Sequence, residues 1–173
     1  MNSFADRLIR ASRLDVSLYE EVERDRNATG QALAVVALAS LATGIGAGGG
    51  LLGLAAGLIA SLLGWYLWSA LTYWIGTRIL PEPTTQSSLG ELLRTIGFAQ
   101  APGILRVLGV IPGLQVILAL ATAIWMLVAA VVAIRQALDY QSTWRAVLVV
   151  IVGWLAQLAL LALVFMVLLA ARS

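Results

Sequence analysis

The chain has 173 residues, of which 61% are hydrophobic and only 12% are charged, with a formal net charge of +2. About a quarter of the residues in a typical soluble domain are charged, so an ordinary soluble fold is excluded, and the small net charge gives no sign of nucleic-acid binding. The chain contains no Cys, His or Lys, so it has no thiolate, imidazole or lysine amine. We therefore expect no metal or cofactor and no covalent catalysis.

Long uncharged runs dominate the sequence: residues 27–77, 107–134 and 146–171. Each run exceeds the roughly 20 residues that a helix needs to cross about 30 Å of hydrocarbon. We predict an all-α, polytopic integral membrane protein: a charged N-terminal segment, residues 1–26, precedes a membrane domain, residues 27–173, with about five transmembrane helices. The expected spans are residues 31–48, 51–77, 95–111, 112–135 and 145–171.

The N-terminal segment alternates charged and apolar residues and lacks the continuous apolar core of a signal peptide. Within it, "SFADRLIRASRL" predicts a short amphipathic helix, with Phe4 and Leu8 on one side and Arg7, Arg10 and Arg13 on the other. This pattern is typical of a helix in the headgroup region with its arginines toward anionic lipid. Docking onto the cytoplasmic surface of the protein itself fits equally well.

A second short helix is expected over residues 18–26, where mixed charges form a solvated face. Ser17 and Glu20 have the spacing of a capping box at its start. The uncharged run that follows is twice the length of one span and should form a helical hairpin that turns at "GIGAGGG", residues 44–50. In its second helix, Gly53 and Gly57 form a GxxxG pair, which we expect to pack internally rather than at a dimer interface.

Residues 78–94 are polar and begin with a Pro- and Ser/Thr-rich loop. Ser88 and Glu91 repeat the capping-box spacing and open a helix with leucines along one side. We expect this helix to lie on the membrane before the chain enters it.

The stretch "TIGFAQAPGILRVLGVIPGL", residues 95–114, is apolar but contains Arg106 and the helix breaker Pro102. If it crosses, Arg106 lies roughly 8 Å from the far end of the helix, within snorkelling reach. Gly97 and Gly103 would let neighbouring helices cover the exposed backbone. Crossing is therefore possible, and a re-entrant segment is the alternative.

The next span is expected to begin with Pro112 in its first turn, where a missing N–H costs nothing. A cytoplasmic N-terminus leaves nine of the eleven arginines inside whether the chain has four spans or five. The positive-inside rule thus puts the N-terminus in the cytoplasm but does not count the spans. Five spans leave both outer turns free of charge, a small advantage.

A family resemblance adds to this. The features are G-F-A-x-A-P-G at residues 97–103, I-P-G at 111–113, Trp125 with Arg135 after it, and "TWRAVLVV" at 143–150. In this order they resemble the bacterial branch of the Yip-domain family, named after Ypt/Rab-interacting proteins. The resemblance implies five spans and a cytoplasmic N-terminus, so residues 95–111 should cross. The D-L-Y-G-P motif of eukaryotic members is not present, and "DVSLYEE" at Asp15 replaces it poorly, so GTPase binding is not expected.

No carboxylate lies in a predicted span, so we expect no enzymatic activity, and ion-coupled transport fits less well than binding. The resemblance implies a factor that organises or shapes the membrane, or mediates interactions there. The alternative is a small accessory subunit packed against a larger membrane complex. The expected partners are the lipid bilayer and either further copies of the chain or another membrane protein, in a bacterial cytoplasmic membrane.

Overall fold

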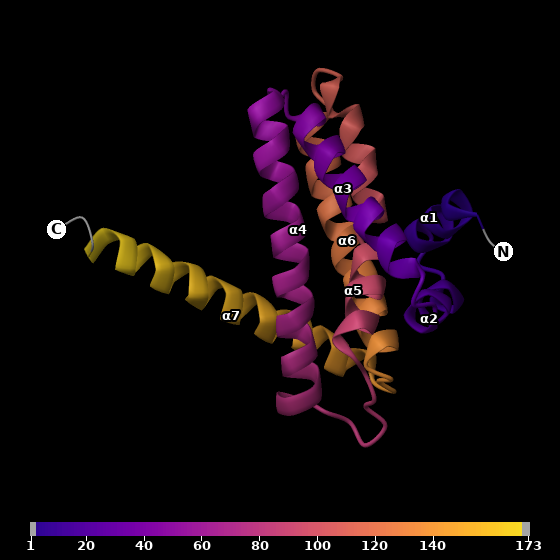
Figure 1. Ribbon diagram of the computed structural model, residues 1–173. Coiled ribbons are helices and arrows are strands. Elements are labelled where there is room, and N and C mark those ends of the chain that lie inside the picture. Colours follow the sequence, from indigo (N-terminus) through magenta and orange to yellow (C-terminus); the bar gives the residue numbers. More distant parts are fainter. Residues whose placement is uncertain (1–2, 171–173) are drawn as a thin grey trace.

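The computed structural model describes residues 3–170, which fold into helices that form a bundle (Figure 1). The all-α prediction is confirmed for this part of the chain. Among the described residues, three helical stretches are long and apolar enough to span a membrane: Ala28–Gly46, Leu51–Ile79 and Gln115–Ala137. The elements in order are α1 (Phe4–Ser12), α2 (Val16–Arg24), α3 (Ala28–Gly46), α4 (Leu51–Trp74), the π-helix η1 (Ile75–Ile79), α5 (Leu89–Phe98), the 3₁₀-helix η2 (Ala101–Val110), α6 (Gln115–Ala137) and α7 (Thr143–Ala170).

The predicted single helix over residues 95–111 is wrong in form. Two helices replace it, α5 and η2, which meet at Ala99 and Gln100. Pro102 lies in the first turn of η2, where its missing N–H costs nothing. An α-helix rises 1.5 Å per residue and a 3₁₀-helix about 2 Å, so the two ten-residue helices together extend about 35 Å. This broken segment is therefore long enough to cross the hydrocarbon.

The α5–η2 segment runs parallel to α3 along a seam of small residues, which we call the α3 seam. Three glycines of the segment lie on α3. A Cβ atom added to Gly97 or Gly103 would lie only 2.7 Å or 3.2 Å from an alanine Cβ of α3, and Gly109 faces the α3 backbone. The contacts are Gly97 on Ala32, Gly103 on Ala39, and Gly109 on Gly46.

The spacing of the α3 seam explains why η2 is a 3₁₀-helix. The contacts lie seven residues apart on α3, about two α-helical turns. On η2, Gly103 and Gly109 lie six residues apart, two turns of a helix with three residues per turn. Both glycines therefore face α3, as does Arg106 midway between them. In an α-helix a six-residue spacing would turn one of the glycines away.

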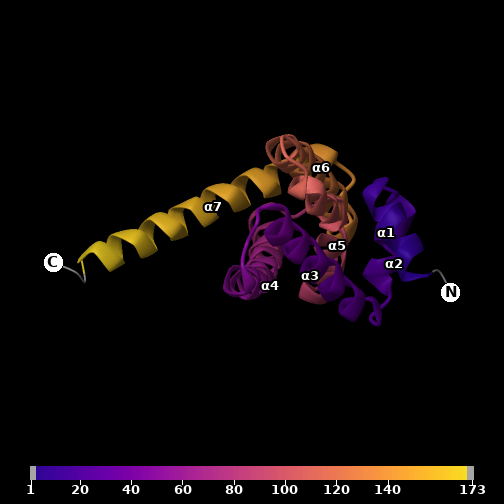
Figure 2. The same cartoon turned by 90° about the horizontal axis from the view of Figure 1, so that it is seen from above.

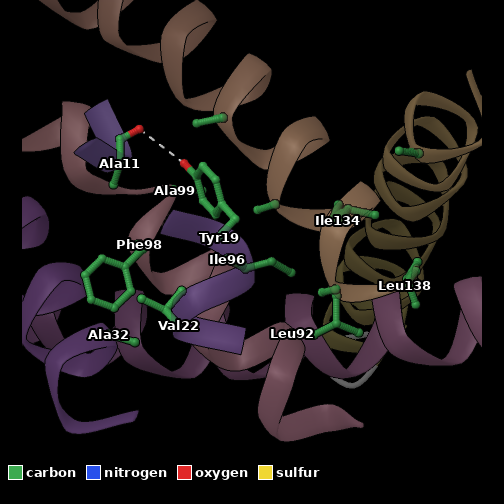
Figure 3. Close-up of a cluster of buried hydrophobic side chains, with 14 of the residues drawn as sticks. Ala11, Tyr19, Val22, Ala32, Leu92, Ile96, Phe98, Ala99, Ile134 and Leu138 are labelled. Atoms are coloured by element: carbon green, nitrogen blue, oxygen red, sulfur yellow. Dashed lines mark hydrogen bonds between the residues drawn. The ribbon is translucent and has the colours of Figure 1, made fainter. Parts of the chain in front are cut away.

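A buried apolar cluster joins α5 to the N-terminal helices, α3 and α6 (Figure 3). Phe98 and Leu92 of α5 are fully buried there, and the Tyr19 hydroxyl donates to the Ala11 carbonyl at 3.2 Å. The expectation that α5 lies on the membrane surface is wrong, because its residues 94–98 are all buried between neighbouring helices.

Three predicted helix starts can now be compared with the structure. The Ser88–Glu91 capping box is confirmed, with both of its hydrogen bonds present. The Ser17–Glu20 box is wrong, because Asp15 caps α2 and accepts both the backbone N–H and the hydroxyl of Ser17. Pro112 lies not in α6 but in the turn before it, where Gly113 has a φ of +87°.

Side chains around the loop after η1 and the turn after α6 fasten the start of α7 to α4. The Tyr140 hydroxyl lies 2.7 Å from the carbonyl oxygen of Leu80, just after η1. Glu82 accepts the Gln141 N–H at 2.8 Å and pairs with Arg145 at 3.4 Å. From this anchored start α7 projects away from the bundle (Figures 1 and 2).

A single methyl group should test the α3 seam. A Cβ atom at Gly46 would collide with the backbone carbonyl oxygen of Arg106, which cannot move independently of η2. We expect Gly46→Ala to lower the free energy of unfolding by about 1–3 kcal/mol, measured as a lower melting temperature in mild detergent. The control is Gly57→Ala, where the added Cβ meets open space and stability should hold or rise slightly. Equal melting temperatures for the two variants would contradict the close packing of η2 on α3 at Gly46.

Candidate functional site

The N-terminal hairpin of α1 and α2 is held by ion pairs of Arg7, which is buried, and Arg10, which is half-buried. Arg7 donates to Glu21 and Asp25 of the α2 segment and to the Gln31 side chain of α3, each at 2.9–3.0 Å. Its guanidinium holds the pKa of Asp25 below its usual range. Arg7 therefore ties α1, α2 and α3 together.

Arg10 belongs to the same network. It pairs with Asp15 and Glu21 at 2.8 Å and donates to the Ser17 hydroxyl at 2.9 Å. The hydrogen bond from Arg10, with a second from Ser17, lowers the pKa of Asp15 to about 2. Arg7 and Arg10 thus point toward carboxylates of their own chain.

The other residues predicted for the membrane surface lie differently. Arg13 is exposed at the end of α1, while Phe4 and Leu8 are half-buried against the apolar cluster. The Trp125 indole N–H of α6 donates to the Ser12 carbonyl at 2.7 Å, so α1 lies along the flank of the bundle. Contact between lipid and the outer side of α1 stays a prediction.

Arg94 of α5 is a buried residue that the sequence did not single out. Its guanidinium donates to the carbonyl oxygen of Val22 at 2.8 Å and to that of Glu23, the last turn of α2. A cation is favourable at the C-terminal end of a helix, whose carbonyls lack backbone partners. Arg94 thus fixes the N-terminal hairpin to α5.

A group of carboxylates surrounds this contact. Burial, followed by the nearby carboxylates of Asp139 and Glu91, raises the pKa of Glu23 to about 7. Burial also raises the pKa of Asp139, again with Glu91 as a neighbour. Among the residues that the structure describes, no three His, Cys, Asp or Glu side chains are arranged to hold a metal ion.

A cavity of about 380 Å³ opens among α3, α4, η2 and α6. Gly53 and Gly57 line it, and a Cβ atom added to either would meet nothing within 4 Å, so the internal packing expected of them is not seen. The polar side chains of Ser40, Ser61 and Gln100 line the same cavity, together with Arg106. The GxxxG pair in the sequence thus marks residues that line this cavity, but it did not predict the cavity itself.

Arg106 is the charged group of the cavity. Its Nε donates to the Thr122 hydroxyl of α6 at 2.7 Å, and Thr122 in turn donates to the Leu118 carbonyl. The Arg106 side chain also borders two further cavities, of about 90 Å³ and 250 Å³. Arg106 therefore lines all three of these cavities.

The remaining predicted packing residues divide between seam and turn. Gly97 and Gly103 belong to the α3 seam, and the buried Pro102 lies between them. Pro112 is exposed in the turn before α6. The structure thus brings Gly53, Gly57 and Gly103 together around one cavity and keeps Pro112 apart.

Apolar helices with carboxylates at one end and a single arginine at depth define a polytopic helical membrane protein. The family model of the Yip1 domain matches residues 17–166, and the chain belongs to this family. The resemblance noted in the sequence is thereby confirmed at the level of the family. Comparison with curated proteins gave no match, and comparison with solved structures gave none.

Docking of the N-terminal hairpin should depend on pH through Glu23. Its pKa of about 7 lies above the ordinary value of 4.5, so the folded state binds a proton between these values that the undocked state does not. The contribution of Glu23 to stability should therefore be fully present below about pH 4.5 and be lost as the pH rises to about 7. The melting temperature of Glu23→Gln, measured from pH 5 to pH 8, should lack most of this pH-dependent loss.

Glu20→Gln removes one carboxylate from the more exposed side of the same helix and serves as the control. It should retain most of the pH dependence. An unchanged pH profile in Glu23→Gln would contradict the assignment.

Proposed function

We propose that the chain is a non-enzymatic membrane protein that organises or shapes a bacterial cytoplasmic membrane by associating with further copies of itself. One observation carries the proposal. The packed unit leaves most of α4 uncovered, and α7 projects from it (Figure 2). In α4 the first two side chains, Leu51 and Leu52, are 83% and 87% exposed.

The exposed part of α7 lacks a polar face. In the described part of α7 the last buried residue is Gly153, which packs on the Trp68 ring, and the side chains of residues 154–159 are not buried. Gln157 is the one polar residue after Gly153 and before Ala170. A helix that is apolar on all sides belongs in hydrocarbon or against another protein.

A second copy fits this surface. In a two-fold symmetric dimer the same patch serves both partners, so α7 of each copy can cover α4 of the other and close the assembly. Exposed leucines on the two helices supply matching apolar surfaces. An accessory subunit of a larger complex would use the same surface with a different partner.

The proposal also includes a membrane topology, based on the packing of the helices. We propose five spans, α3, α4, α5–η2, α6 and α7, with the N-terminus in the cytoplasm. The α3 seam supports this, because α5–η2 accompanies α3 along its length. The carboxylates and nine of the eleven arginines then lie on the cytoplasmic side.

Absence of enzymatic activity is part of the proposal. The carboxylates lie away from the cavity, and several are paired with arginines at the N-terminal hairpin. Catalysis at the cavity would need an acid, base or nucleophile next to Arg106, and its polar lining consists of hydroxyls and one amide.

Cross-linking in native membranes tests self-association, since the chain has no native Cys. When copies with Leu155→Cys on α7 are co-expressed with copies with Leu63→Cys on α4, residues that are 61% and 59% exposed, oxidation should give disulfide-linked dimers. The matched control is Val116→Cys on α6, 67% exposed, which should stay monomeric. Cross-links from α4 and α7 to one different protein would instead identify an accessory subunit. Monomers throughout would contradict both readings.

A further inference from the structure

The charge of Arg106 has no counter-ion among the described residues of the chain. In the described residues its one hydrogen bond is to Thr122, and no carboxylate pairs with it. The nine acidic residues all lie in the N-terminal segment, in the loop before α5, at the start of α5 or after α6. An unpaired arginine at membrane depth costs free energy, so intramembrane charges normally have a partner.

The depth of Arg106 follows from its neighbours. Thr122 is the eighth residue of α6, so the guanidinium lies about 10 Å along the helix from its first residue. The Arg106 backbone packs beside Gly46, the last residue of α3. The side chain thus reaches from the end of the bundle that carries the turns at residues 47–50 and 111–114 into the hydrocarbon of that leaflet.

Neutral polar groups surround the guanidinium. In the part of the chain that the structure describes, the side chains of Ser40, Ser61 and Gln100 line the cavity without a protein hydrogen-bond partner. Hydroxyls and a primary amide supply hydrogen-bond donors, and Arg106 adds its terminal N–H groups. Together they match a ligand that carries negative charge on several oxygen atoms.

The shape of the cavity adds an apolar requirement. Along α4 its lining extends from Gly53 to Trp65, twelve residues, or about 18 Å along the helix axis. Leu54 and Met126 contribute apolar walls to this slot. A helix of a partner protein is about 10 Å across and does not fit a hollow of this size, whereas a single acyl chain does.

From these observations we infer that the cavity binds an anionic phospholipid, with the lipid phosphate on Arg106 and an acyl chain along the glycine-lined face of α4. The bound phosphate supplies the counter-charge that the chain lacks. Small residues at positions 53 and 57 leave the space that the acyl chain occupies. This inference requires only α3, α4 and α6 in the membrane and is independent of self-association.

Native mass spectrometry of the delipidated protein in mild detergent tests the site. The probes are phosphatidylglycerol, phosphatidylcholine with the same acyl chains, and inorganic phosphate. We expect tight retention of phosphatidylglycerol, weaker retention of phosphatidylcholine and no effect of inorganic phosphate. Arg106→Gln should weaken phosphatidylglycerol binding about tenfold to a hundredfold, the usual effect of losing hydrogen bonds to a charged group. Arg78→Gln removes the same charge from an exposed position and should leave binding unchanged.

A second variant tests the slot without touching the charge. Gly57→Leu fills the cavity from a position with open space and should also weaken binding, whereas Gly30→Leu, exposed and outside the cavity, should not. Circular dichroism and gel filtration verify the fold of each variant. Equal lipid binding by wild type, Arg106→Gln and Gly57→Leu would overturn the inference. Binding of inorganic phosphate as tight as that of the lipid would also overturn it. So would the finding that a stoichiometric protein partner occupies the site in place of the lipid and is released by Arg106→Gln.

Discussion

The close backbone approach along the α3 seam is the constraint on which the rest of the structure depends. It allows a helix broken at Ala99 and Gln100 to stay packed, because α3 covers backbone that a proline and a 3₁₀ turn would otherwise expose. Glycines six residues apart require three residues per turn, and that same geometry places Arg106 between them. A seam built for packing thus also sets the position of the one deep charge.

The arginines divide by the way their charge is balanced. At the hairpin end, Arg7 and Arg10 meet carboxylates of α2, and Arg94 meets the last carbonyls of the same helix. These contacts make the charged N-terminal segment part of the bundle. At the opposite end Arg106 binds a hydroxyl and, within the described part of the chain, no carboxylate, so the proposed lipid supplies the negative charge that carboxylates or carbonyls of the chain supply elsewhere.

Local signals in the sequence predicted local structure well. The Ser88–Glu91 capping box and the glycine turn after α3 need only neighbouring residues, and both are confirmed. The burial of α5 and the 3₁₀ form of η2 depend on α3, which is distant in sequence, so local periodicity missed them. The partners of Arg7 were equally hidden, because lipid phosphates and the carboxylates of α2 satisfy the same amphipathic pattern. At the cavity, the GxxxG pair predicted small residues but not the space they leave open.

The most direct test of this account asks on which side of the membrane the turn before α6 lies. In the structure the contact between Gly46 and Gly109 puts this turn at the same end as the turn after α3. Single cysteines at Pro112 and Gly50, both exposed, would be probed in intact cells with an impermeant thiol reagent. The account predicts that both react from one side and that Ser88→Cys reacts only from the other. Labelling of Pro112→Cys on the side of Ser88→Cys would contradict it.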